Sequence, residues 1–389
     1  MLLQTATALL SIVASATAAT VPTSNVKGAA FDRLAIIYFE NENYAKSAGD
    51  TNFAWLAKKG IKLTNYFGVT HPSQPNYVAS VGGDYFGLPG DGHAELPSNV
   101  ASIVDLLESK SISWAHYQED MPYTGFMAES YKNQKNGRND YVRKHNPAVH
   151  YHSVTDNAAR LGQLKNLSRT DTKHSEFHKD LAADKLPQWM FITPNMTSDG
   201  HDTDVATGGR WCRSFLEPLL TDAKFMKNTM VLITWDEAEI TPNAPNQILG
   251  VLLGDAIPSN LVGTTDNSFY THYSSIASVS ANWDLPTLGR WDVGANVYQW
   301  VGNKTGDVIR TWDSSSNQKN HYYATPYAGY LNPDSDNQQI PKPFLDSNAA
   351  GRPVLKSIVD AWSNSDAPSY YSDTIEVADG RNPPEGYES

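Results

Sequence analysis

Hydroxyl, imidazole and amide side chains alternate with prolines in GVTHPSQPNYVAS, residues 68–80, which joins a predicted strand to a predicted helix. A serine or threonine at such a turn can act as a nucleophile, because the first amide groups of the helix can stabilise an anion beside it. Pro75 suits the first helical turn, where no backbone donor is needed. The candidates for chemistry are Thr70, His71, Ser73 and Asn76. The alternative for Ser73 is that it only caps the helix.

Acidic side chains follow other predicted strands at the point where each strand ends. Glu40 follows the apolar run RLAIIYF, and Asp236 with Glu237 follows MVLITW. A further polar stretch, PNMTSDGHDTD, comes after QWMFIT and contains His201. Because the carboxyl ends of parallel strands lie at one edge of an open sheet, we expect these groups to converge. Carboxylate, amide and imidazole groups with few basic residues favour a divalent cation over an acidic ligand.

Each of these side chains also has a purely structural interpretation. A charge directly after a buried strand, as at Glu40 and Asp236, is costly without a partner or a metal. The pair Asp236-Glu237 could instead form a salt bridge with the next helix. His201 lies in a Gly-flanked polar loop, where a ligand, a general acid and an exposed residue all fit the sequence. His272 directly precedes a predicted helix, so a cap role and a catalytic role are equally consistent with its position.

Strands alternating with helices must position these groups. Apolar runs predict strands at residues 33–40, 61–70, 112–118, 188–195, 229–237 and 248–254. Helical spacing predicts helices at residues 52–60, closed by Gly60, at 102–110, capped by Ser102, at 210–225 and at 273–283. This alternation predicts an α/β fold with a mostly parallel central sheet sandwiched between helices.

Length and composition favour one large domain. The chain has 389 residues, of which 40% are hydrophobic, enough for a large buried core. We expect a single catalytic domain at residues 20–375, in which the polar, weakly periodic residues 120–180 form an inserted loop or lid. Residues 376–389 are expected to form a flexible tail. The single Cys212 excludes an intrachain disulfide.

Charge excludes several classes of partner. The net charge of −12 argues against binding to nucleic acid or to anionic membrane surfaces. After residue 19 no apolar run approaches the roughly 18 residues that a membrane span needs, so no stable membrane association is expected.

The first 19 residues carry no charged side chain and end in small residues with an A-x-A pattern, Ala16-Thr17-Ala18. This predicts a secretory signal peptide, with a buried N-terminal helix as the alternative. Three N-x-[ST] sequons fit a secreted glycoprotein, located outside the cell or in the cell wall. They begin at Asn166, Asn195 and Asn303.

Four blocks, in this order, resemble the phosphoesterase family that includes phosphatidylcholine-type phospholipases C and secreted acid phosphatases. The blocks are YFENENY, HPSQPNY, PNMTSDGHD and TWDEAE, between residues 38 and 239, with His272 as a fifth point. The resemblance is greatest to the fungal phosphate-repressible acid phosphatases. It implies an α/β fold similar to alkaline phosphatase and a hydroxyl nucleophile assisted by a divalent metal ion.

The resemblance also implies roles for individual residues. The hydroxyl-x-P-N order is similar to that of related metal-dependent phosphohydrolases, which implies Ser73 as the nucleophile and Asn76 as a contact to a phosphate oxygen. The residues implied for the metal site are Glu40, Asn41, Asp236 and Glu237, although some relatives place Asp at position 237. His201 and His272 are the candidates for protonating the leaving alkoxide. A glycan at Asn195 would crowd this site.

The resemblance therefore implies a secreted acid phosphatase that hydrolyses small phosphate monoesters through a phosphoserine intermediate. One alternative is a phosphodiesterase or phospholipase C acting at the same site. Another is a secreted cell-wall glycoprotein that has kept the fold without chemistry. This last alternative predicts loss of the hydroxyl or of the strand-end acids, and both are present.

Overall fold

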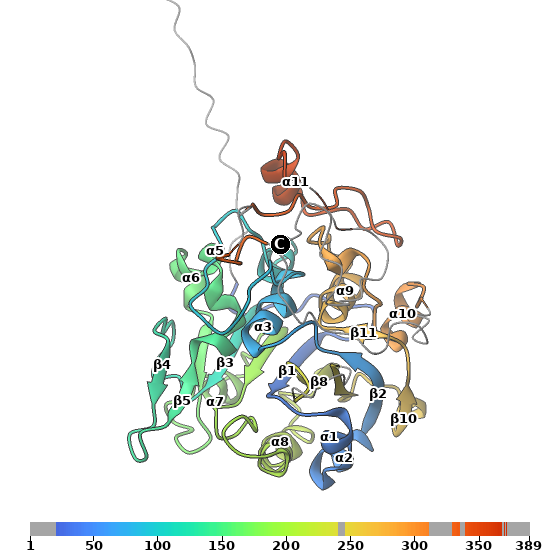
Figure 1. Ribbon diagram of the computed structural model, residues 1–389. Helices are drawn as coiled ribbons and strands as arrows, with labels where there is room; N and C mark the ends of the chain where they lie inside the picture. The colour runs from blue at the N-terminus through green and yellow to red at the C-terminus, as the bar shows by residue number, and fades with distance from the viewer. Residues whose placement is uncertain are drawn as a thin grey trace, which may run out of the picture.

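A computed structural model describes residues 21–239, 246–310, 329–334, 339–367, 369 and 371. The predicted signal peptide at residues 1–19 and the predicted tail at 376–389 lie outside these residues. The fold is built on a nine-stranded sheet in the order β10-β2-β9-β8-β1-β7-β3-β6, with β11 paired to β2 (Figure 1).

Most neighbouring strands of this sheet run parallel. Its strands are β1 (Arg33–Phe39), β2 (Gly60–Phe67), β3 (Trp114–Glu119), β6 (Leu164–Leu167), β7 (Trp189–Thr193), β8 (Thr229–Trp235), β9 (Gln247–Leu253), β10 (Thr264–Asp266) and β11 (Tyr270–Thr271). β9 alone among them is antiparallel to its neighbours, β2 and β8, in the described part of the chain. A hairpin of β4 (Ser130–Lys132) and β5 (Asn139–Val142) forms a second, small sheet.

Helices cover both faces of the large sheet. They are α1 (Tyr44–Gly49), α2 (Thr51–Ala57), α3 (Ser73–Gly82), α4 (Ile103–Ser109), α5 (His152–Thr155), α6 (Ala158–Leu161), α7 (Glu176–Ala182), α8 (Val205–Leu219), α9 (Tyr273–Trp283), α10 (Gln299–Thr305) and α11 (Lys356–Trp362). Short 3-10 turns are η1 (Arg143–His145), η2 (Pro147–His150), η3 (Ser259–Leu261) and η4 (Trp291–Val293). Figure 1 shows α3 and α9 on one side of the sheet and α1, α2 and α8 on the other.

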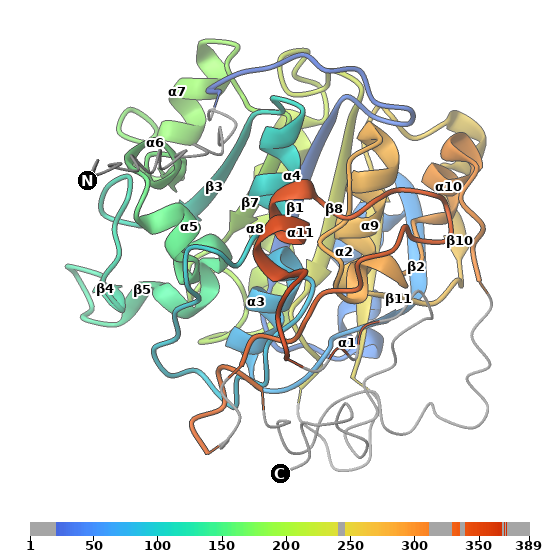
Figure 2. The same cartoon turned by 90° about the horizontal axis from the view of Figure 1, so that it is seen from above.

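The central strands are buried on both faces, which explains their continuous apolar sequences. Every residue of β1, β7 and β8 is buried. Seen from above, α4 and α9 lie over these strands (Figure 2). Sheet and helices together confirm the predicted α/β class with a mostly parallel sheet between helices.

Most predicted element positions are close to the observed ones. α9 spans residues 273–283 as predicted, and α4 begins after Ser102, whose side chain forms a capping box with Asp105. α8 begins earlier than predicted, because Asp204 accepts a hydrogen bond from Thr207 N and caps the helix there.

One prediction about the elements is wrong, and one region contains more regular structure than its sequence indicates. Gly60 does not close α2, which ends at Ala57; it opens β2, where a Cβ atom would collide with the backbone of β9. Residues 120–180, predicted to form an inserted loop or lid, contain several short elements: β6 pairs with β3 at the edge of the main sheet, and η1 and η2 pack against α3. The sequence of this region shows little periodicity because most of its elements have only three or four residues, which is too short for a hydrophobic period to be visible.

No helix among the described residues combines the length and the apolar character that crossing a membrane requires.

His116 of β3 makes the fold sensitive to acid. The ring is fully buried, stacks on Phe191 with centroids 5.4 Å apart, and neither of its nitrogens has a hydrogen-bond partner among the described residues. Burial lowers its pKa to about 3. A lowered histidine pKa favours the neutral form in the fold, so stability is lost as pH falls from the unfolded value of about 6.5 towards 3.

We therefore expect the free energy of unfolding to fall by about 3 kcal/mol more in the wild type than in His116→Leu when the pH is lowered from about 7 to about 4. Urea unfolding at the two pH values measures this difference. An exposed control, His174→Leu, lacks the buried ring and should not reproduce it. Equal pH dependence in wild type and His116→Leu would contradict the prediction.

Candidate active site

Three adjacent parallel strands bring acidic residues to one edge of the sheet. Glu40 directly follows β1 and Asp236 directly follows β8, and the register pairs the preceding residues of the two strands. Asp199 lies in the loop after β7, and its carbonyl oxygen accepts a hydrogen bond from Glu40 N at 3.2 Å. The strand ends therefore converge as expected, and all three carboxylates are buried.

Ser73 is the first residue of α3 and points at this acidic edge. Its hydroxyl donates to Glu40 Oε2 at 2.8 Å and lies 3.3 Å from Asn41 Oδ1. The cap position belongs to Pro72, whose side chain makes no capping hydrogen bond, so the alternative of Ser73 as the cap residue is excluded. Tyr77, one turn later, donates to Glu40 Oε1. Glu40 is thus held by two hydroxyl donors from the same helix.

Asn41 adopts a strained backbone conformation beside Ser73. Its φ of 43° lies in the left-handed region, which non-glycine residues rarely adopt. Its backbone N–H donates to Asp236 Oδ1 at 3.1 Å. Such strain persists only where surrounding contacts enforce it, and it is common at functional sites. The conformation turns the Asn41 side chain towards the Ser73 hydroxyl.

His145 of η1 belongs to the site, although no motif or spacing in the sequence marks it as a candidate. Its Nε2 lies 3.2 Å from Glu40 Oε1, and its Nδ1 lies 3.6 Å from Asp199 Oδ2. Its ring stacks on Tyr77 with centroids 4.9 Å apart. Asp199 was also missed, although it lies two residues before His201 in a polar stretch that follows an apolar strand. That signal could have identified Asp199, whereas only tertiary packing brings His145 to the site.

His201 lies at the more accessible side of the site. Its side chain is 29% exposed, and its Nδ1 lies 2.9 Å from Asp202 Oδ1. Its backbone N–H donates to Asp199 Oδ1 at 2.8 Å, and its ring centroid is 6.0 Å from that of His145. It is therefore close to the buried acids and still open to solvent.

His272 is placed differently from His201. The ring is fully buried, with Nε2 2.6 Å from the carbonyl oxygen of Asp236 and Nδ1 2.5 Å from the hydroxyl of Tyr38. Burial lowers its pKa to about 4. Both ring nitrogens are engaged and the ring stays neutral in mild acid, so this geometry contradicts the predicted role as proton donor. His272 instead supports the backbone at Asp236.

Asn76 and Glu237 hold the turn that precedes α3. Asn76 Oδ1 accepts from Val69 N at 2.9 Å and from Thr70 N at 3.1 Å, while its Nδ2 donates to Glu237 Oε2 at 3.1 Å. Glu237 Oε2 also lies 3.0 Å from His71 Nδ1. These contacts favour a positioning role for both side chains over the predicted phosphate contact of Asn76 and metal contact of Glu237.

The acidic cluster is electrostatically unfavourable by itself. Burial raises the pKa of Glu40, Asp199 and Glu237 well above the ordinary range, and repulsion from Asp236 adds to the shift of each. Burial also raises the pKa of Asp236, to about 6. Asp236 Oδ2 and Asp199 Oδ2 are buried without a hydrogen-bond partner among the described residues. Buried oxygens of this kind call for a bound ion or water.

The oxygen donors beside Ser73 fit a hard divalent cation. Glu40, Asn41 and Asp236 offer two carboxylates and one amide oxygen, which are ligands that such cations prefer. In the part of the chain that the structure describes, no three His, Cys, Asp or Glu side chains form a ready metal-ligand group. Mg²⁺ typically uses only one or two carboxylates and keeps several waters. The donors are therefore chemically compatible with such an ion.

The three sequons differ in accessibility. Asn195 Nδ2 donates to Asp120 Oδ2 at 2.7 Å, and Asn166 in β6 donates to the carbonyl oxygen of His174 at 3.1 Å. Asn303 in α10 is exposed. A glycan is therefore accommodated most easily at Asn303.

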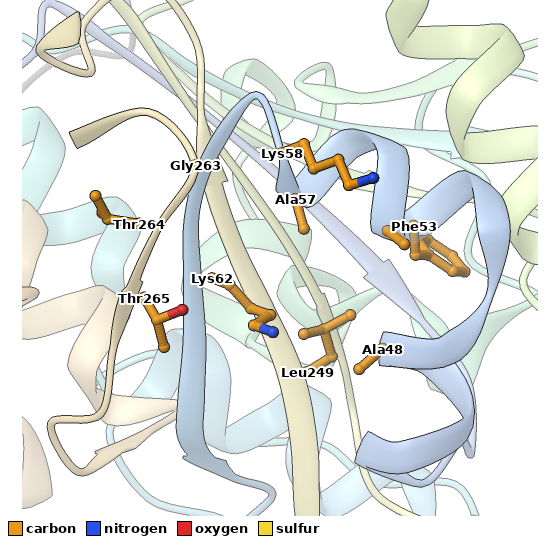
Figure 3. A pocket seen from close by; sticks show the side chains of 10 residues that line it. Ala48, Phe53, Ala57, Lys58, Lys62, Leu249, Gly263, Thr264 and Thr265 are labelled. Atoms are coloured by element: carbon orange, nitrogen blue, oxygen red, sulfur yellow. The ribbon is translucent and has the colours of Figure 1, made fainter. Parts of the chain in front are cut away.

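A separate hollow of about 170 Å³ lies between α2, β2 and β10 (Figure 3). Lys58, Lys62 and Thr265 are among its lining residues, and no acidic or histidine side chain lines it. It lies beside the first residues of β2, whereas Ser73 follows the carboxyl end of that strand. The hollow is therefore not part of the acidic site.

Comparison with known proteins shows clear relatives. The model of the phosphoesterase family matches residues 35–286. An acid phosphatase of Aspergillus fumigatus is 52% identical over 78% of this chain and 66% of its own length. A phosphate-repressible acid phosphatase of Penicillium chrysogenum is 46% identical over 93% of this chain and 85% of its own. A solved structure described as a protein in the alkaline phosphatase superfamily, from Vibrio parahaemolyticus, aligns over 67% of this chain and 68% of its own, with 9% identity and a TM-score of 0.42.

Proposed function

The chain belongs to the phosphoesterase family, and on this basis we propose that it is an acid phosphatase that hydrolyses phosphate monoesters with Ser73 as nucleophile. The observation that carries the proposal is the Ser73 hydroxyl, which donates to the buried carboxylate of Glu40 at 2.8 Å. The names of the fungal relatives support the reaction type and the substrate class.

In the first step, Ser73 Oγ attacks phosphorus while its proton passes to Glu40 Oε2. The bond from phosphorus to the ester oxygen breaks, and the product is a phosphoserine. Tyr77 holds the Glu40 carboxylate by donating a hydrogen bond to Oε1, and His145 Nε2 lies 3.2 Å from the same oxygen.

Glu40, Asn41 and Asp236 are the residues that would hold a divalent cation. When bound, such a cation would screen the negative charge of the phosphate oxygens. The pairing of Asn41 N–H with Asp236 Oδ1 fixes the relative position of two of these side chains.

His201 is the histidine that fits the proton transfers at the leaving group. It is partly exposed, and its backbone N–H donates to the buried carboxylate of Asp199, so its ring lies beside the acids and open to solvent. In the first step it would donate a proton to the departing alkoxide. In the second step, as neutral imidazole, it would accept a proton from the water that attacks the phosphoserine. The bond from phosphorus to Ser73 Oγ then breaks, and Glu40 returns its proton to that oxygen.

Hydrolysis of para-nitrophenyl phosphate and of bis(para-nitrophenyl) phosphate, with and without chelator, tests this function. We expect the monoester to be the better substrate, activity to be strongest below neutral pH, and chelator to abolish it until a divalent cation is restored. Faster turnover of the diester would move the protein to a phosphodiesterase or phospholipase C. Turnover of neither ester at any divalent cation tried would indicate a non-catalytic glycoprotein.

We also propose that the protein is secreted as a glycoprotein, with the mature chain beginning near residue 19 or 20. The uncharged N-terminal sequence and the exposed sequon at Asn303 support this. Recovery of Met1 at the N-terminus of extracellular protein would contradict it.

A further inference from the structure

We propose that Lys144 determines the preference of the site for monoesters, by pairing its ammonium group with the second negative charge that a phosphate monoester carries and a diester lacks. The inference rests on the proposed function of the Ser73 site and adds a specificity residue to it.

The contacts of His145 and of Asp91 fix the position of Lys144 beside α3. It precedes His145, whose ring contacts Glu40, in the 3-10 turn η1 that packs against α3. Its side chain is 18% exposed, and its Nζ lies 2.8 Å from Asp91 Oδ2. The other oxygen of Asp91 accepts a hydrogen bond from Gln74 N at 3.0 Å. One carboxylate therefore joins the ammonium group to the residue directly after Ser73.

The charge of Lys144 acts on the acidic site itself. Burial lowers the pKa of this ammonium, but attraction by Glu40 and Asp91 outweighs burial and the net shift is upward. In return, Lys144 is the cation that lowers the pKa of Glu40 and of Glu237 against the larger effect of burial. The ammonium group therefore stays charged, and the carboxylate of Asp91, which it shares with Gln74 N, places it beside the first turn of α3.

Two other basic side chains, Arg143 and Lys46, pair with groups outside the acidic site. Arg143 donates to the carbonyl oxygen of Val149 and lies 3.4 Å from Glu95. Lys46 pairs with Glu239 at the exposed rim. Lys144, in contrast, uses one of its three N–H donors on Asp91, which leaves donors for a phosphate oxygen. In a diester, an ester group replaces one of the anionic oxygens, so the same ammonium contributes less.

If Lys144 is only a counterion of Asp91, its removal should affect the two ester classes differently from the removal of a specificity residue. If Lys144 only neutralised Asp91, its removal would disturb the loop and slow both ester classes equally. A specificity role predicts loss for the monoester alone. The ratio of kcat/KM for the two esters separates these roles, because titrations of the free enzyme affect both substrates and cancel in the ratio.

The test measures kcat/KM of Lys144→Met and wild type for para-nitrophenyl phosphate and bis(para-nitrophenyl) phosphate between about pH 5 and pH 7, with cation supplied. We expect Lys144→Met to lose about a hundredfold on the monoester and less than about threefold on the diester. The wild-type ratio should rise as the monoester gains its second charge near pH 6, and the ratio of the variant should stay flat. Lys144→Arg should restore part of the preference, and the rim control Lys46→Met should leave the ratio unchanged.

Equal loss on both esters, or a ratio that still rises with pH in Lys144→Met, would overturn the inference. If Lys144→Met does not fold, Lys144→Gln is measured in its place with the same two criteria. A wild type that hydrolyses neither ester, or that prefers the diester, would instead defeat the proposed function. These outcomes therefore distinguish failure of the inference from failure of the function on which it rests.

Discussion

Ser73→Ala is expected to lower kcat/KM for a phosphate monoester by about a thousandfold or more while the protein remains folded. The substitution removes the attacking oxygen. It removes no helix cap, because the cap position before α3 is Pro72 and the first-turn amide of Gln74 donates to Asp91 rather than to Ser73. Glu40 keeps its contacts with Tyr77 and His145. Steady-state kinetics and a thermal melt of the purified variant measure both parts of this prediction.

Thr70 supplies the matched control for this change. It is the other hydroxyl of the turn, is buried, and donates to the carbonyl oxygen of His71 at 3.3 Å. Thr70→Val keeps the shape of the side chain and should keep activity within about tenfold. An active Ser73→Ala together with an inactive Thr70→Val would show that the wrong hydroxyl was assigned.

Asp236→Asn should separate activity from stability. The amide keeps the oxygen that accepts from Asn41 N, and it replaces the buried oxygen that has no hydrogen-bond partner among the described residues. Because the change removes a charge from the donors proposed for the cation, we expect metal affinity to fall and activity to drop by about a hundredfold or more.

The same substitution should stabilise the protein when metal is removed. Burial raises the pKa of Asp236 to about 6 in the fold, above the unfolded value of about 3.9. An acid with a raised pKa favours the fold only while protonated, so this contribution is lost as pH rises from about 4 through about 6. In chelator at about pH 7, Asp236→Asn should therefore be more stable than the wild type by about 3 kcal/mol, and near pH 4 the two should be equal.

Urea unfolding in chelator at both pH values, together with metal analysis, measures these effects. Asp204→Asn is the matched control, because Asp204 is an exposed cap of α8 and asparagine caps a helix equally well. An Asp236→Asn variant with full activity, or one less stable than wild type in chelator at about pH 7, would show that the site is wrongly assigned.

Two acids of the site, Glu40 and Asp236, could be predicted because each directly follows a doubly buried strand. Continuous apolar runs such as β1 and β8 identify the strands, and the charged residue at the end of each run, Glu40 or Asp236, then lies at the ligand-binding edge. The turn before α3 could likewise be recognised from its prolines and hydroxyl groups. Each of these signals lies within one short stretch of sequence, and its interpretation does not depend on tertiary contacts.

Other parts of the site depend on tertiary contacts that leave no local signal. His145 and Lys144 lie in the short turn η1, whose position is set by packing against α3. The sequence around His272 fits a cap or a proton donor equally well, and only its burial between Tyr38 and the Asp236 carbonyl decides against the donor. Asn76 has the sequence position of a substrate contact, but its amide is used to close the turn.

Trapping of the covalent intermediate tests the assignment of Ser73 most directly. Wild-type protein is mixed with a monoester labelled in its phosphate, quenched in acid and digested, and the labelled peptide is sequenced. We predict stoichiometric label on Ser73 and none on Ser73→Ala. Label on Thr70 or on a histidine, or turnover without any covalent phosphate at the earliest quench times, would contradict the serine mechanism.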